Sequence, residues 1–238
     1  MERNHIIKHL GFCLFSLPCF LNLAFANGLN NVLPEIEELP GMQTQWIGKQ
    51  MVINGVPTSM RAFSSPKSSR EVLNEYAHRW KSRSLSAITH SEFDGNKSVG
   101  MEYRNHFYSV QAKDVYGGSE GVLTVSVAPS DIQPDFSTRF PLPLGAKVEQ
   151  KIESLDQGAM AETLVVTGEQ SASSMAAFVE TTLNREGWVS QNYAEPSSVL
   201  DQYVLNYQRG TELSQITILG KSPAFSDKTM MTIHWVKN

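Results

Sequence analysis

Three side chains in the segment 89–94 have the types and the spacing of a divalent-metal site. His90, Glu92 and Asp94 alternate along it, so a β-strand would place all three on one face. Imidazole and carboxylate groups are common metal ligands. No second group of ligands stands near them, so we favour a simpler interpretation. These three side chains form the solvent-facing side of an amphipathic strand, and alternate residues such as Thr89 face inward.

A second candidate is the aromatic strip Tyr103–Tyr108, which contains Arg104. Aromatic rings interleaved with a cation can stack on sugars or bases. Aromatic residues that alternate along strands also form cores and cross-strand pairs. The strip is therefore predicted to contribute to packing.

Glycine-rich and serine-rich segments carry no recognisable catalytic motif. Gly117–Gly121 lacks the Lys-Ser/Thr of a phosphate-binding loop, so it predicts a hairpin loop. Ser171–Ser174 lacks a nucleophile elbow, and helix capping explains Ser171. We assign no catalytic residue, no cofactor-binding residue and no metal ligand, and we expect no cofactor. The sequence thus favours a protein without enzymatic activity.

The charge balance argues against bulk electrostatic binding. The 238 residues include 20 Lys and Arg and 24 Asp and Glu, which gives a formal net charge of −4 at pH 7. A mildly acidic chain without a basic tract is a poor candidate for binding nucleic acid or anionic lipid.

Residues 1–26 have the pattern of a cleavable signal peptide. Arg3 and Lys8 precede an apolar run from Leu10 to Phe25, and Ala24-Phe25-Ala26 places small residues at the cleavage site. Both cysteines lie within this run, so the mature chain is expected to lack disulfides and cysteine-ligated metals. No later apolar stretch reaches the length of a membrane-spanning helix. We therefore expect a periplasmic or secreted protein.

Two turn-rich segments divide the remaining chain. Residues 27–41 are acidic and predict a flexible lead-in, and residues 129–143 contain several prolines and predict a linker. They leave a first unit at 42–128 and a second unit at 144–238.

The second unit has a clear helix signal. Ser171 can cap a helix from Ala172 to Glu186, whose apolar residues recur at helical spacing. Gly187 stands at the position that favours a left-handed residue, and Trp188 follows where it can pack on Leu183. Strands are expected before and after this helix.

The first unit repeats these signals. Asn54-Gly55 predicts a tight hairpin turn, and Ser68 with Glu71 forms a capping box for a helix with Trp80 on its buried stripe. Aligning Ser68 with Ser171 also aligns Gly55 with Gly158. We therefore predict an α+β fold of two tandem β-β-α-β-β-β units, each with a single helix on an antiparallel sheet.

The motif from Phe178 to Trp188, an aromatic helix followed by Leu-x-x-x-Gly-Trp and a strand, resembles one found in exported proteobacterial proteins. Together with Phe140–Gly145 and Glu162–Thr167, it resembles a group of largely uncharacterised periplasmic proteins over residues 137–237. The first unit has Ser84-Leu85 in place of Gly-Trp. At the level of fold, these units are also similar to helix-on-sheet units of envelope assembly lipoproteins.

Two classes of function are compatible with these observations. The first is a non-enzymatic envelope protein, accessory to the assembly or secretion of surface structures. It would bind other envelope proteins through sheet edges or the groove beside each helix. The second is a periplasmic ligand-binding protein or hydrolase with a pocket between the units. The sequence does not specify the partner or the oligomeric state.

We predict cleavage after Ala26, because the Ala-Phe-Ala site follows an apolar run of signal-peptide length. Intact-mass analysis of protein recovered from the extracytoplasmic fraction measures the new N-terminus. A chain that retains Met1, or one lipidated at Cys19, would show the prediction to be wrong.

Overall fold

The protein is described by a computed structural model that covers residues 32–82, 87–93, 96–128, 134–156, 158–191, 201–222 and 227–237. The predicted signal peptide, its cleavage site, Asp94 and the Ser84-Leu85 pair lie outside these residues. Within them the chain forms two helices and twelve strands.

Each half of the chain contains a hairpin, one helix and a four-stranded meander. The first half consists of β1 (Gln43–Ile53), β2 (Val56–Ser65), α1 (Ser69–Lys81), β3 (Thr89–Phe93), β4 (Asn96–Tyr103), β5 (His106–Val115) and β6 (Gly118–Val127). The second half consists of β7 (Lys147–Asp156), β8 (Ala159–Gly168), α2 (Ala172–Arg185), β9 (Val189–Ser190), β10 (Gln202–Arg209), β11 (Glu212–Leu219) and β12 (Thr229–Lys237).

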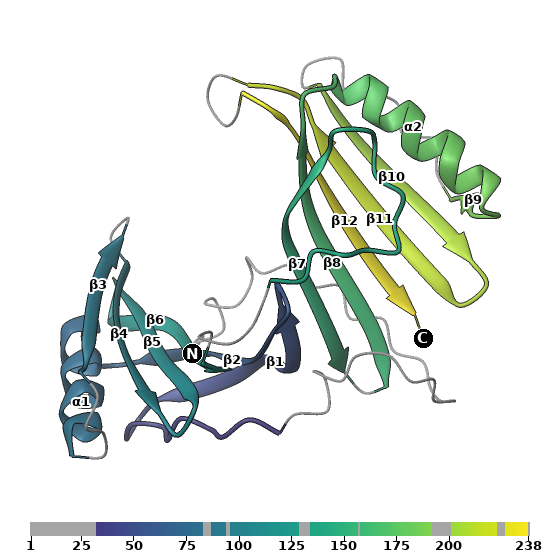
Figure 1. Ribbon diagram of the computed structural model, residues 1–238. Helices are drawn as coiled ribbons and strands as arrows, with labels where there is room; N and C mark the ends of the chain where they lie inside the picture. The colour runs from purple at the N-terminus through teal and green to yellow at the C-terminus, as the bar shows by residue number, and fades with distance from the viewer. Residues whose placement is uncertain are drawn as a thin grey trace, which may run out of the picture.

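All twelve strands belong to one antiparallel sheet, in the order β3-β4-β5-β6-β2-β1-β7-β8-β12-β11-β10-β9 (Figure 1). The predicted α+β class with two β-β-α-β-β-β units is therefore wrong, because strands dominate the fold and one sheet runs through both halves. Each half also has four strands after its helix. The strands extend up to their turns, as β7 and β8 do on either side of Gly158, and β1 pairs with β7 across the halves.

A short ladder joins the halves. It runs over the pairs Met51–Ser154, Val52–Glu153 and Ile53–Ile152. Asn54, in the left-handed region at φ 51°, extends it. Its N–H donates to the carbonyl oxygen of Lys151 at 2.8 Å, and its Oδ1 accepts from the N–H of Lys151 at 2.8 Å. Its carbonyl also accepts from the N–H of Asp135 at 3.2 Å. The predicted Asn54-Gly55 turn is confirmed, and the same residue fixes the register between the halves.

The end of α2 confirms the predicted cap. Gly187 has φ 82°, and its N–H donates to the carbonyl of Asn184 at 3.1 Å. The N–H of Trp188 donates to the carbonyl of Leu183 at 3.0 Å, which completes a Schellman motif. Trp188 is buried and packs against Phe140 at a ring-centroid distance of 6.1 Å.

Each half has its own apolar core beneath its helix. The first includes Tyr76 and Trp80 of α1, and the second includes Trp188 and Trp235. Segments before the first strand of each half also contribute. Ile36, in the segment expected to be a flexible lead-in, is buried in the first core, and Phe140 is buried in the second. The hydroxyl of Tyr76 donates to the carbonyl of Glu37 at 3.0 Å, and burial raises the pKa of Tyr76 to about 12.

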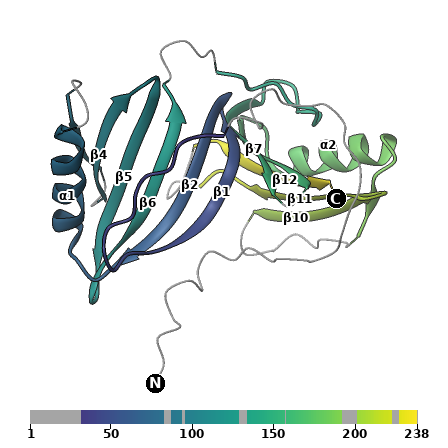
Figure 2. The ribbon, with the colours of Figure 1, turned by 90° about the horizontal axis from the view of Figure 1, so that it is seen from below.

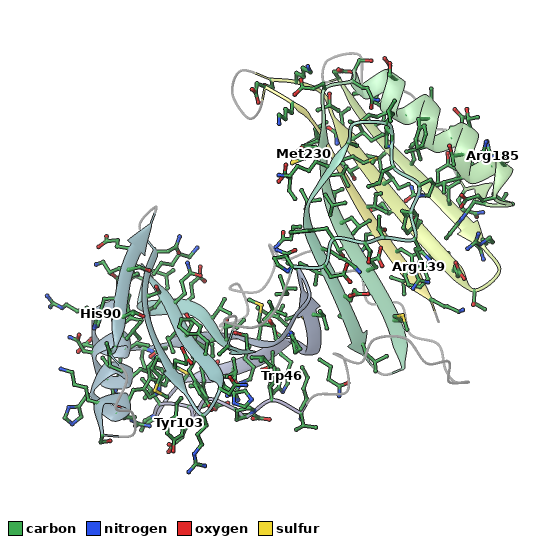
Figure 3. The ribbon with its side chains drawn as sticks, in the orientation of Figure 1. Trp46, His90, Tyr103, Arg139, Arg185 and Met230 are labelled. Atoms are coloured by element: carbon green, nitrogen blue, oxygen red, sulfur yellow. The ribbon has the colours of Figure 1, made fainter. Side chains whose placement is uncertain are left out.

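Both helices lie on the same side of the sheet. We call the opposite side the open face, and in the second half it is formed by the residues that alternate with the core residues of β8, β10, β11 and β12. They include Thr163, Val165, Val204, Asn206, Gln215, Thr217, Met230, Thr232 and His234. No Lys, Arg, Asp or Glu lies on this face within these four strands. Figure 3 shows Met230 on the side turned towards the first half, whereas Arg185 lies on the far side.

Replacing Trp188 by Ala should lower the free energy of unfolding by roughly 3–5 kcal/mol, the usual cost of emptying a large buried aromatic site. Gly187→Ala should cost on the order of 1 kcal/mol, because a Cβ is strained at positive φ. Urea unfolding followed by circular dichroism measures both values.

Val189→Ala is the matched control, because Val189 is 62 % exposed next to buried Trp188. It should change the stability by less than about 0.5 kcal/mol. Wild-type stability of Trp188→Ala would contradict the core position of Trp188.

Candidate functional site

A pocket of about 340 Å³ lies between α1 and the edge of the sheet. We call it the α1 pocket, and it is lined by Arg70, Leu73, Asn74, His90, Ser91, Glu92, Lys97 and Ser98. The first three belong to α1, and the others belong to β3 and β4. Figures 1 and 2 show α1 beside this end of the sheet, and Figure 3 shows His90 at its outer edge.

A capping box begins the helix that forms one wall of this pocket. The N–H of Glu71 donates to the Oγ of Ser68 at 3.4 Å, and the N–H of Ser68 donates to a carboxylate oxygen of Glu71 at 2.9 Å. The capping box predicted from the sequence is therefore confirmed. Hydrogen bonds from Ser68 lower the pKa of Glu71, which keeps this carboxylate charged at the helix start.

Asp114 of β5 anchors the same helix turn to the sheet. Its carboxylate accepts from the N–H of Ser69 at 2.7 Å and from the hydroxyl of Ser69 at 2.9 Å. These hydrogen bonds, above all the one from the backbone, lower the pKa of Asp114. Arg70 follows Ser69 directly, so this anchor also fixes where the Arg70 side chain starts.

His90 and Glu92 lie on the helix side of the sheet, opposite to the orientation expected from the sequence. His90 pairs with Val99 and Glu92 pairs with Lys97, and directly paired residues share a face. Val99 is fully buried in the first core, so this face is the one that α1 covers. Because α1 packs on β4, β5 and β6, the side chains of residues 89–92 of β3 lie beyond its cover and are exposed.

The described residues do not assemble a metal site around His90. No group of three His, Cys, Asp or Glu side chains with suitable geometry occurs among them. Asp94, the third residue of the sequence pattern, lies outside the described part of the chain. The hydroxyls of Ser91 and Ser98 are 2.7 Å apart across the strands.

β3 is an edge strand. Among the described residues it pairs with β4 alone, so its other side offers backbone donors and acceptors. Such an edge can accept an added strand. The α1 pocket and this open edge share β3, an arrangement that only the strand order reveals.

The aromatic strip forms a turn and packs against the core. Arg104 and Asn105 have φ of 49° and 62° and connect β4 to β5. Tyr103 and Tyr108 pack against the first core, which confirms the predicted packing role. The guanidinium of Arg104 lies 5.1 Å from the ring centroid of Tyr103. The turn itself was missed, although an Arg-Asn pair between aromatic stretches is compatible with left-handed residues.

The glycine and serine segments have the structural roles that the sequence predicts. Gly117, at φ 85°, lies in the turn between β5 and β6. The Oγ of Ser171 accepts from the N–H of Ser174 at 3.2 Å and caps α2.

Sequence reasoning missed three buried charges, Arg61, Lys151 and Glu162. Two of them, Arg61 and Glu162, are hydrogen-bonded to neighbouring groups. Arg61 of β2 donates to Glu38 at 2.9 Å and also to the carbonyl of Ile36. Glu162 of β8 accepts from the hydroxyl of Thr138 at 2.9 Å. Because each charge binds the segment that precedes its half, we interpret both as structural ties.

A half-buried histidine on the open face, His234, was also missed. The Nδ1 of His234 lies 2.9 Å from the hydroxyl of Thr163, and burial lowers the pKa of His234. Its imidazole is therefore neutral near pH 7, so it adds no charge to this face.

None of the helices in the described part of the chain is both long and apolar enough to cross a membrane. No protein-family model, no curated protein and no solved structure matches the chain. Function is therefore inferred from the geometry of the α1 pocket and the β3 edge.

Replacing Asp114 by Asn should lower the free energy of unfolding at neutral pH, because a neutral amide is a weaker acceptor for the two Ser69 donors. The folded-state pKa of Asp114 is lowered, so its stabilisation is present above the unfolded pKa of about 4 and disappears as the pH falls through the folded value. The difference in the free energy of unfolding between wild type and variant should therefore shrink as the pH falls from 5 to strongly acidic values.

Urea unfolding over this pH range measures the effect. Glu180→Gln, at an exposed position of α2, controls for the general loss of a carboxylate. A difference for Asp114→Asn that stays constant with pH would rule out the carboxylate as the anchor.

Proposed function

We propose that this chain is an exported protein without catalytic activity, accessory to the assembly or secretion of cell-envelope or surface structures. It acts by binding extended segments of other envelope proteins at the edge strand β3. The signal-peptide pattern of residues 1–26 and the resemblance to exported periplasmic proteins support its location outside the cytoplasm.

The observation that carries this proposal is the α1 pocket beside an edge strand. Strand addition supplies main-chain hydrogen bonds, which provide affinity for any extended segment. A neighbouring pocket adds selectivity, because alternate side chains of the added strand point to the helix side. The α1 pocket is of the size that receives a side chain or a small group.

The alternative, a ligand-binding protein or hydrolase, would use a pocket between the two halves. The α1 pocket lies within the first half, and so does a small hollow next to Trp46. Neither favours this alternative.

Photo-crosslinking in intact cells tests the proposed function. A photoreactive phenylalanine analogue in place of Ser91 should yield discrete adducts with exported proteins, because Ser91 is an exposed residue of the open edge. The same photoreactive analogue in place of Arg185 of α2 is the control, and it should not yield these adducts.

The crosslinked partner, once identified and purified, should perturb the NMR signals of β3 amides in the mature protein. Adducts that form equally at both positions, or a partner that leaves the β3 amides unchanged, would show that β3 is not the binding edge.

A further inference from the structure

The structure offers a more specific inference, which rests on the proposed function. We propose that the segment added to β3 carries an acidic side chain, whose carboxylate binds in the α1 pocket to Arg70 and Lys97. The ligand class of this site is therefore an extended acidic peptide segment.

The α1 pocket contains two cations that have no ion-pair partner among the described residues. Arg70 and Lys97 line it together with one carboxylate, Glu92. Within the described part of the chain, neither cation forms an ion pair. In contrast, Lys67 and Arg79 of the same helix region both pair with Glu75.

The carboxylate of Asp114, which neighbours Arg70 through Ser69, is already bound by Ser69. Hydrogen bonds from Ser69 and, to a smaller extent, the charges of Lys97 and Arg70 lower the pKa of Asp114, so this carboxylate offsets part of their charge without forming an ion pair with them. The oxygens of Asp114 accept from the backbone and the hydroxyl of Ser69. The two cations are therefore available to a carboxylate supplied from outside.

A side chain of a strand added to β3 can reach the two cations. Adjacent strands lie about 4.8 Å apart, so a strand beside β3 lies roughly 10 Å from the backbone of Lys97 on β4. A lysine and a glutamate side chain extended towards each other span that distance. Arg70 approaches the same space from α1. Alternate residues of the added strand share the face of His90 and Glu92, so one of them points over the pocket.

Glu92 should weaken the binding of an acidic side chain in the α1 pocket. It lies directly opposite Lys97 in the ladder and is exposed. It would therefore repel an incoming carboxylate at the rim of the pocket, so its removal should favour acidic ligands.

The second half provides an internal comparison. The positions on α2 that align with Arg70 and Asn74 are Ser173 and Ala177, and β9 spans only Val189–Ser190. The described residues of the second half thus lack a cation at the place of Arg70 and lack a long open edge there. We therefore expect the first half, and not the second, to prefer acidic segments.

Two synthetic octapeptides test the proposal. They alternate threonine and valine and differ only in a central glutamate or glutamine, with both ends blocked. In NMR titrations of the mature protein at low ionic strength, both should shift the β3 amides. The glutamate peptide should bind on the order of fivefold more tightly, the effect of one partly exposed ion pair.

Variants assign the preference to its residues. Arg70→Gln or Lys97→Gln should remove most of the difference between the peptides, whereas Glu92→Gln should increase it. Arg185→Gln removes an exposed cation of α2 and should leave the ratio unchanged. The NMR spectrum of each free variant verifies its fold.

The outcomes separate the two proposals. Equal binding of both peptides at β3 would overturn the acidic preference and leave the proposed function standing. A preference that survives in Arg70→Gln and Lys97→Gln would overturn the assignment to the α1 pocket. If neither peptide shifts the β3 amides, the strand-addition function fails and the acidic preference fails with it.

Discussion

The pairing of β1 with β7 determines on which side of the sheet both helices lie. Val52 pairs with Pro57 in the first half and with Glu153 in the second, and in both it lies on the helix side. Because side chains alternate along a strand, a slip of one residue in this ladder would move the second core to the opposite face. Asn54 opposes such a slip, since its backbone and its side chain both bind the backbone of Lys151.

Because both helices lie on one side of the sheet, two consequences follow for its other parts. The open face has no covering layer among the described residues, and β8, β10, β11 and β12 supply it only with uncharged side chains, including a neutral His234. On the helix side, a helix about 10 Å wide covers roughly two strand spacings, fewer than the six strands of each half. The segments containing Ile36 and Phe140 cover part of the remainder. In the first half, β3 stays beyond this cover, and the α1 pocket results.

Local features were predictable from the sequence because short-range chemistry determines them. Ser68, Asn54 and Gly187 act through neighbours in the chain, and their cap and turn roles are confirmed. The fold class was wrong because pairing between β1 and β7 depends on residues nearly one hundred positions apart, such as Asn54 and Lys151. The prediction of the face on which His90 lies was wrong for a similar reason. Alternation shows that His90 and Glu92 share a face, but only their pairing with Val99 and Lys97 shows which face it is.

This distinction explains why the candidate site is inconspicuous in the sequence. A polar strand such as Thr89–Phe93 has the composition of a solvent-facing edge, and charged edges are a common protection against unwanted pairing. Its polar residues also line the α1 pocket, because β3 lies beside α1. Asp114 fixes the first turn of this helix to β5. The uncovered outer strands of the two halves differ in length and in their neighbours. The second half shortens β9 to two residues, whereas the first half retains β3 and places Arg70 and Lys97 beside it. The proposed binding function therefore uses the first half, and the second half extends the sheet to which β3 belongs.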